Sequence, residues 1–181
     1  MLTILFYLDD GAGIFLWALL AALLHEMGHI CASLCLGGRW ESLLLSMLGA
    51  ELRFQYSELQ PYWKENIVAL AGPVMNLLAG EILWYCDCLL AGMISFALGL
   101  FNLLPVQPLD GGKMAFNLAA EFFGLDTAEW ISAVLTGVCV GGVAGIGVVA
   151  ATQFANFTIV SVSVWLLFNA MKSGNKNFSK K

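Results

Sequence analysis

Charged residues are scarce in this sequence. Asp, Glu, Lys and Arg together make up 12% of its 181 residues, whereas a soluble domain contains about 25%. Apolar residues account for 60%, and the mean hydropathy is +0.81. A soluble fold would have to bury several apolar runs of about 20 residues, each long enough to cross the hydrocarbon core. We therefore exclude an ordinary soluble domain and predict an integral membrane protein surrounded by lipid bilayer.

Basic residues are fewer than acidic ones, eight against 13, and the net charge is -5. Because the sequence has no basic patch or stripe, we expect no nucleic acid as a partner. The basic residues near the predicted spans gather on one side, which by the positive-inside rule places the C-terminus in the cytoplasm and the N-terminus outside. The site described below then faces the cytoplasm. We expect a multi-pass protein of a bacterial cell membrane.

The five cysteines do not form a pair of C-x-x-C motifs. In apolar surroundings a free cysteine behaves as a small apolar residue. The C-x-C of Cys86 and Cys88 is therefore interpreted as packing, with metal binding or oxidation as the alternative. The N-terminus lacks a basic region before its apolar residues, so we expect no cleavable signal peptide.

The apolar runs predict an all-α polytopic membrane protein with about five transmembrane helices. We expect one membrane-embedded domain over residues 1–174 and a polar cytoplasmic tail over 175–181. The expected spans are Ile14–Leu36, Asn66–Tyr85, Leu89–Leu104, Trp130–Ala151 and Phe157–Met171.

A polar stretch with strand-like alternation separates the first two spans. Ala50, Leu52, Phe54 and Tyr56 alternate with polar residues, a period of two that indicates a strand. We predict a short β hairpin or sheet here. Its unpaired edge either packs against the protein or pairs with an extended peptide.

The chain has only two histidines, and both lie in the first apolar run as His25-Glu26-Met27-Gly28-His29. Residues four apart share one face of a helix, so the two imidazoles can bind one metal ion while Glu26 acts as a base for water. Ionisable groups at the centre of a span cost roughly 2.5 to 3.5 kcal/mol each, which favours a functional role. The alternatives are buried packing histidines, or haem ligation, which requires histidines from two helices.

Catalytic zinc needs a third protein ligand and an open position, and Asp110 is the candidate. The prolines and glycines of Pro105–Gly112 predict a non-helical Asp-Gly loop after the third span, followed by a short helix over Lys113–Gly124. Such backbone is tolerated at membrane depth where protein or water satisfies it, so Asp110 is expected to line a hydrated cavity. The alternative is an ordinary surface turn.

Two of the asparagines in or near the spans are candidate site residues. Asn76, in the second span, suits either helix-to-helix contact or orientation of a substrate or water. Asn102, near the end of the third span, suits either support of the Asp110 loop or contact with a substrate main chain.

Three motifs occur in order: H-E-x-x-H, A-G-P-x-x-N over residues 71–76, and N-L-L-P-x-x-P-L-D-G-G over 102–112. With them the chain resembles the site-2 protease family of intramembrane zinc metalloproteases, and most closely the bacterial branch that includes the stage IV sporulation protease. The resemblance implies peptide-bond hydrolysis in or near the membrane. It also implies Zn²⁺ on the residues matching His25, His29 and Asp110, a general base at Glu26, and family asparagines at Asn76 and Asn102.

The resemblance implies a membrane-associated or single-span protein as substrate, bound in extended form. We expect the strand at Leu52 and Phe54 to pair with it and the two asparagines to anchor its main chain. The chain has no room for a PDZ or CBS domain, so we expect regulation by a separate membrane protein. The alternative functions are a metal transporter that uses the same three residues, and an inactive relative that binds membrane segments without cutting.

Overall fold

The computed structural model describes residues 13–46, 49–55, 61–154 and 164–165. It divides into two compact units, Met1–Asn102 and Leu103–Lys181, and the described residues of each are treated separately. The fifth predicted span lies almost wholly outside the described residues, and the predicted polar tail lies entirely outside them.

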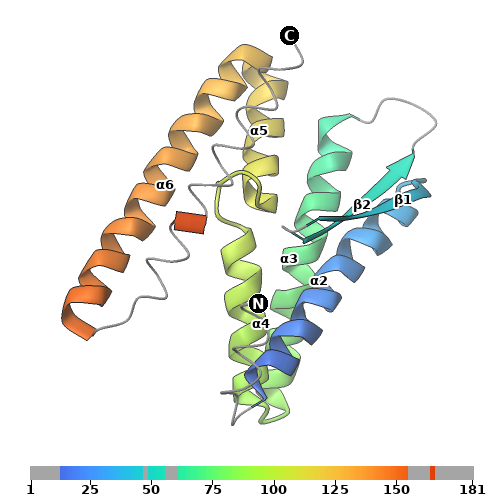
Figure 1. Ribbon diagram of the computed structural model, residues 1–181. Helices are drawn as coiled ribbons and strands as arrows, with labels where there is room; N and C mark the ends of the chain where they lie inside the picture. The colour runs from blue at the N-terminus through green and yellow to red at the C-terminus, as the bar shows by residue number, and fades with distance from the viewer. Residues whose placement is uncertain (1–12, 47–48, 56–60, 155–163, 166–181) are drawn as a thin grey trace. The chain divides into compact units, whose positions relative to one another are not determined.

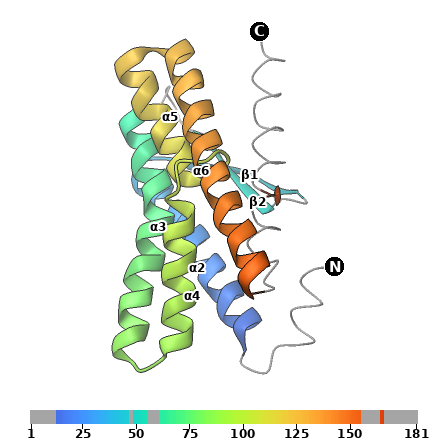
Figure 2. The same cartoon turned by 90° about the vertical axis from the view of Figure 1, so that its left-hand side faces the viewer.

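Three helices make up most of the described first unit: α2 (Ile14–Cys35), α3 (Tyr62–Tyr85) and α4 (Leu89–Asn102). All three contact one another, and α3 and α4 run side by side in both views (Figures 1 and 2). α2 and α3 are long and apolar enough to cross a membrane, and α4 is a shorter apolar helix. α3 begins at Tyr62 instead of Asn66, because Pro61 stands just before the helix, where its missing N–H is not needed.

Small residues fill the interior of this unit and large apolar residues point outward. Ala21, Ala69 and Ala91 are buried, whereas Leu78 and Ile82 are 57% and 63% exposed. Small residues let helix backbones approach closely, and in lipid the outward side chains meet acyl chains. This distribution agrees with a membrane-embedded helix bundle.

Two antiparallel strands, β1 (Arg39–Ser46) and β2 (Gly49–Gln55), follow α2. In their register Leu43 is opposite Leu52 and Trp40 is opposite Phe54. These strands occupy the segment whose alternation predicts a short hairpin.

The described second unit contains α5 (Asp110–Phe123) and α6 (Leu125–Phe154), which contact each other. Gly124 joins them with a φ of 83°, a left-handed conformation that glycine adopts without steric cost. α6 provides the third stretch that is long and apolar enough to cross a membrane. The described residues thus support three spans, and the number five stays a prediction.

The loop before α5 is shorter than the sequence predicts. Asp110 is the first residue of α5 and Gly111 and Gly112 follow within its first turn, so the predicted non-helical Asp-Gly loop is wrong for these three residues. The non-helical segment ends at Leu109, whose extended backbone precedes the helix. A carboxylate in the first turn is favoured by the helix dipole, which explains why the helix begins at Asp110 instead of Lys113.

Candidate metal centre

His25 and His29 face each other from successive turns of α2. Their Nε2 atoms lie 3.1 Å apart. Two nitrogens bound to one tetrahedral zinc ion, at about 2.05 Å each, are about 3.3 Å apart. The spacing of the pair therefore fits two ligands of one ion.

The orientation of His29 is set by α3. Its Nδ1 lies 2.7 Å from the carbonyl oxygen of Val68. Because a carbonyl only accepts hydrogen bonds, Nδ1 carries the proton and donates it, and Nε2 of the neutral ring keeps its lone pair. This is the tautomer that a metal ligand bound through Nε2 requires.

Gly72 of α3 leaves space beside the ligand nitrogens. A Cβ atom at this position would lie 2.5 Å from Nε2 of His29 and 2.9 Å from Cε1 of His25. Any other residue would displace the rings or occupy the volume next to them. The A-G-P-x-x-N motif contains Gly72, but the sequence does not place this glycine in the site, because its closeness to the histidines depends on how α3 packs on α2.

Asn76 adjoins the other side of the His25 ring. It has no exposed surface, and its Nδ2 lies 3.2 Å from Nδ1 of His25. Its Oδ1 is buried without a hydrogen-bond partner among the described residues, an arrangement that costs about 1–3 kcal/mol. The predicted contact between Asn76 and a substrate main chain would require the surrounding residues to move.

The remaining predicted residues of the first unit lie as follows. Glu26 is half-buried on α2, next to His25 in sequence. Asn102 is half-buried, and its Nδ2 donates to the carbonyl oxygen of Leu98 within α4 at 3.0 Å. Leu52 and Phe54 belong to β2.

Asp110, in the second unit, is 5% exposed at the N-terminus of α5. Its Oδ1 accepts a hydrogen bond from Nζ of Lys113 at 3.0 Å, and the lysine side chain is 59% exposed. Solvent screens the charge at the exposed lysine end and so weakens the pair. The lysine therefore contributes little to holding the carboxylate in place.

Backbone contacts hold the first turn of α5. A Cβ atom on Gly111 would meet the carbonyl group of Leu103, and one on Gly112 would lie 2.5 Å from the carbonyl oxygen of Val106. The segment before α5 thus folds tightly against the helix start, and only residues without side chains fit there. Within the segment before α5, the Gln107 N–H donates to Oγ1 of Thr136 on α6 at 3.3 Å.

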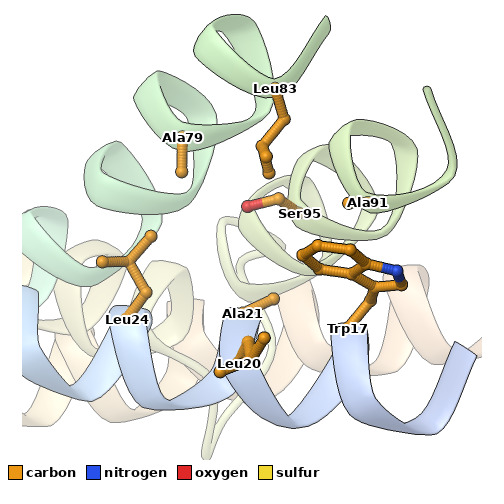
Figure 3. Close-up of a pocket in the computed structure, with 8 residues that line it drawn as sticks. All are labelled: Trp17, Leu20, Ala21, Leu24, Ala79, Leu83, Ala91 and Ser95. Atoms are coloured by element: carbon orange, nitrogen blue, oxygen red, sulfur yellow. The ribbon is translucent and has the colours of Figure 1, made fainter. Parts of the chain in front are cut away.

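A small apolar pocket of about 70 Å³ lies among α2, α3 and α4. Figure 3 shows the Trp17 indole at one end and the Ser95 hydroxyl among aliphatic side chains. The Ser95 hydroxyl donates to the backbone oxygen of Asn76 at 2.9 Å. No residue that lines this pocket is titratable, so it does not supply catalytic groups.

The comparisons with known proteins agree with the motifs. Residues 87–142 match Peptidase family M50. The chain is 28% identical over 165 residues to sll0528 of Synechocystis sp., which is named as a zinc metalloprotease; the match covers 82% of this chain and 43% of that protein. It is 27% identical over 160 residues to Stage IV sporulation protein FB of Bacillus subtilis, covering 83% of this chain and 53% of that protein.

The fold also matches a solved structure. The site-2 protease from Methanocaldococcus jannaschii aligns with a TM-score of 0.71 and 22% identity, covering 96% of this chain and 84% of that chain. This likeness shows the fold. The resemblance to the site-2 protease family is confirmed, although the chain spans only about half the length of the two curated relatives.

Proposed function

We propose that this chain, which has the site-2 protease fold and resembles Peptidase family M50, is an intramembrane zinc metalloprotease. Its substrates are membrane-associated or single-span proteins. The observation that carries the proposal is the pair of histidine Nε2 atoms 3.1 Å apart beside Gly72 in an apolar helix bundle. Histidines with this spacing and no side chain between them suit a metal ion better than they suit packing.

His25, His29 and Asp110 hold the zinc ion in this proposal. Each offers one ligand atom, a ring nitrogen or a carboxylate oxygen. Three protein ligands leave a fourth position open, as catalytic zinc sites do. A carboxylate oxygen is one of the ligand atoms that zinc accepts, and Asp110 begins helix α5 with such a group. The two compact units then act together as one protease domain over residues 1–174.

Glu26 is the general base and acid. When bound, zinc lowers the pKa of water toward about 7 and polarises a carbonyl oxygen. Glu26, half-buried beside His25, takes the proton from the attacking water and later gives it to the leaving amine.

The substrate binds in extended form. A helical segment hides its carbonyl groups in internal hydrogen bonds, so it must unwind before a peptide bond can be attacked. We assign the edge of β2, at Leu52 and Phe54, to pairing with the unwound segment. Asn102 contacts its main chain near the end of α4.

The protein lies in a bacterial cell membrane with its N-terminus outside and its C-terminus and active site toward the cytoplasm. The basic residues near the predicted span ends support this orientation. A separate membrane protein regulates access of the substrate.

A Glu26→Gln variant tests the proposal. It should keep its zinc, because glutamine preserves the shape, and lose cleavage of single-span substrates by at least about 100-fold. The matched control is Glu81→Gln, since Glu81 is an exposed carboxylate on α3, and it should cleave at the normal rate. Normal cleavage by the Glu26→Gln protein would end the proposal.

The transporter alternative needs only metal affinity and a second exit. None of the proteins named above is described as a transporter. Uptake of zinc into vesicles, measured beside proteolysis, separates the two functions.

A further inference from the structure

The two ring nitrogens of His25 have different neighbours. Nε2 lies 3.1 Å from Nε2 of His29, and Nδ1 lies 3.2 Å from Nδ2 of Asn76. A neutral imidazole has one proton, so the neighbour of Nδ1 decides whether Nε2 carries a hydrogen or a lone pair. Asn76 thereby controls which nitrogen of His25 can bind a metal ion.

With Nδ2 of Asn76 against the ring, the amide donates and Nδ1 of His25 accepts. The ring proton is then on Nε2 and points at the lone pair of His29. A protonated Nε2 cannot be a ligand. The opposite arrangement, in which Nδ1 donates to an oxygen, leaves a lone pair on both Nε2 atoms.

We propose that Asn76 is a positioning residue whose side-chain amide rotates by half a turn. Its Oδ1 then accepts the Nδ1 proton of His25, and Nε2 of His25 can bind zinc. This inference rests on the zinc site of the proposed function. A half-turn of the amide exchanges two atoms of almost the same size. Oδ1 of Asn76 has no hydrogen-bond partner among the described residues in its present position. Rotating the amide therefore breaks no hydrogen bond to Oδ1.

In this arrangement α3 supplies a hydrogen-bond acceptor to Nδ1 of both histidines. The Val68 carbonyl accepts the Nδ1 proton of His29 at 2.7 Å, and Oδ1 of Asn76 does the same for His25. Val68, Gly72 and Asn76 follow one another at four-residue spacing, which places them on one face of the helix. That face supplies an acceptor, a gap and a second acceptor to the two imidazoles.

The Asn76 backbone is fixed independently of its amide. The Ser95 hydroxyl of α4 donates to its carbonyl oxygen at 2.9 Å, and its side chain is fully buried. A buried side chain on a fixed backbone has few rotamers. Turning the amide is therefore the available adjustment.

Two substitutions that keep the branching of asparagine at Cγ test the direction of the hydrogen bond. Asn76→Asp supplies only acceptor oxygens, whereas Asn76→Leu supplies neither donor nor acceptor. Zinc affinity is measured on the full chain in detergent by competition with a chelator, and cobalt binding is followed by its visible spectrum. We expect Asn76→Asp to bind zinc within about threefold of the unchanged protein and Asn76→Leu to bind about 10–100-fold more weakly.

Two outcomes of the zinc-affinity measurement would overturn the inference. Weaker binding by Asn76→Asp than by Asn76→Leu would overturn the inference, because it would show that the amide must donate. Equal and normal binding by both would also overturn it, because packing alone would suffice. Nitrogen NMR of the zinc-loaded protein gives a second measure: the His25 proton should be on Nδ1, and a proton on Nε2 would refute the inference.

Two controls separate other causes. Thr152→Ala removes a hydroxyl that donates only within α6, to the carbonyl oxygens of Val148 and Val149, and should leave zinc affinity unchanged. If the unchanged protein binds no zinc, the proposed function fails; if it binds zinc and the Asn76 variants behave against expectation, only this inference fails.

Discussion

Replacing Gly72 with alanine should strongly weaken zinc binding through one added methyl group. The Cβ atom would lie 2.5 Å from Nε2 and 2.6 Å from Cε1 of His29, and 2.9 Å from Cε1 of His25. Ordinary contact begins at 3.4 Å, so the His29 ring must move by 3.4 − 2.5 = 0.9 Å. Both rings contact the same added atom, and the hydrogen bond to Val68 opposes the movement of one of them.

The size of the effect follows from this displacement. Zinc ligands hold their distances within about 0.2 Å, and the required movement is several times larger. We expect zinc affinity to fall by at least about 100-fold, which corresponds to about 2.7 kcal/mol. Cleavage should fall with it, because the ion is required for hydrolysis.

Chelator competition on purified Gly72→Ala protein measures the affinity. Gly80→Ala is the matched control on the same helix, because its Cβ atom would lie 3.0 Å from the Phe96 ring, away from the histidines. Both variants crowd α3, but only Gly72→Ala should lose zinc. A folded Gly72→Ala protein that binds zinc within threefold of the unchanged protein would refute the placement of Gly72 beside the ligands.

Three further predictions concern other parts of the chain. Asp110→Asn should weaken zinc binding by at least about 100-fold, because a neutral amide is a poor zinc ligand. Lys113→Ala should change it less than about threefold, since the lysine side chain is 59% exposed and solvent screens its charge. Equal binding by both variants would remove Asp110 from the site. Leu52→Pro or Phe54→Pro should slow substrate cleavage about tenfold or more and leave zinc content unchanged, because proline removes a backbone donor from the strand edge; unchanged turnover would exclude strand pairing. Gly28→Ala should lower the free energy of unfolding by about 1–3 kcal/mol, because its Cβ atom would lie 2.6 Å from the Ala71 oxygen. The control is Gly137→Ala, whose Cβ atom would have nothing within 4 Å. In a thermal melt the control should unfold at the normal temperature.

The helices and the histidine pair could be predicted from the sequence because they depend on local patterns. Four-residue spacing alone brings His25 and His29 together on α2, and long apolar runs locate α2, α3 and α6. These features need no knowledge of how helices pack. The start of α5 could not be predicted, because Gly111 and Gly112 have the composition of a loop.

The contacts that complete the metal site could not be predicted in the same way. The Val68 carbonyl, the gap at Gly72 and the Asn76 amide act on the histidines only because α3 packs against α2 at one particular rotation. A sequence motif indicates that these positions matter but gives no direction for any hydrogen bond. The direction of these hydrogen bonds can be assigned only once the packing of the helices is known.

The backbone contacts around Gly111 and Gly112 determine which changes the Asp110 segment can tolerate. Main-chain atoms of Leu103 and Val106, and not their side chains, set the close approach to the helix start. Any side chain at Gly111 or Gly112 would therefore push the helix start away from the segment that precedes it.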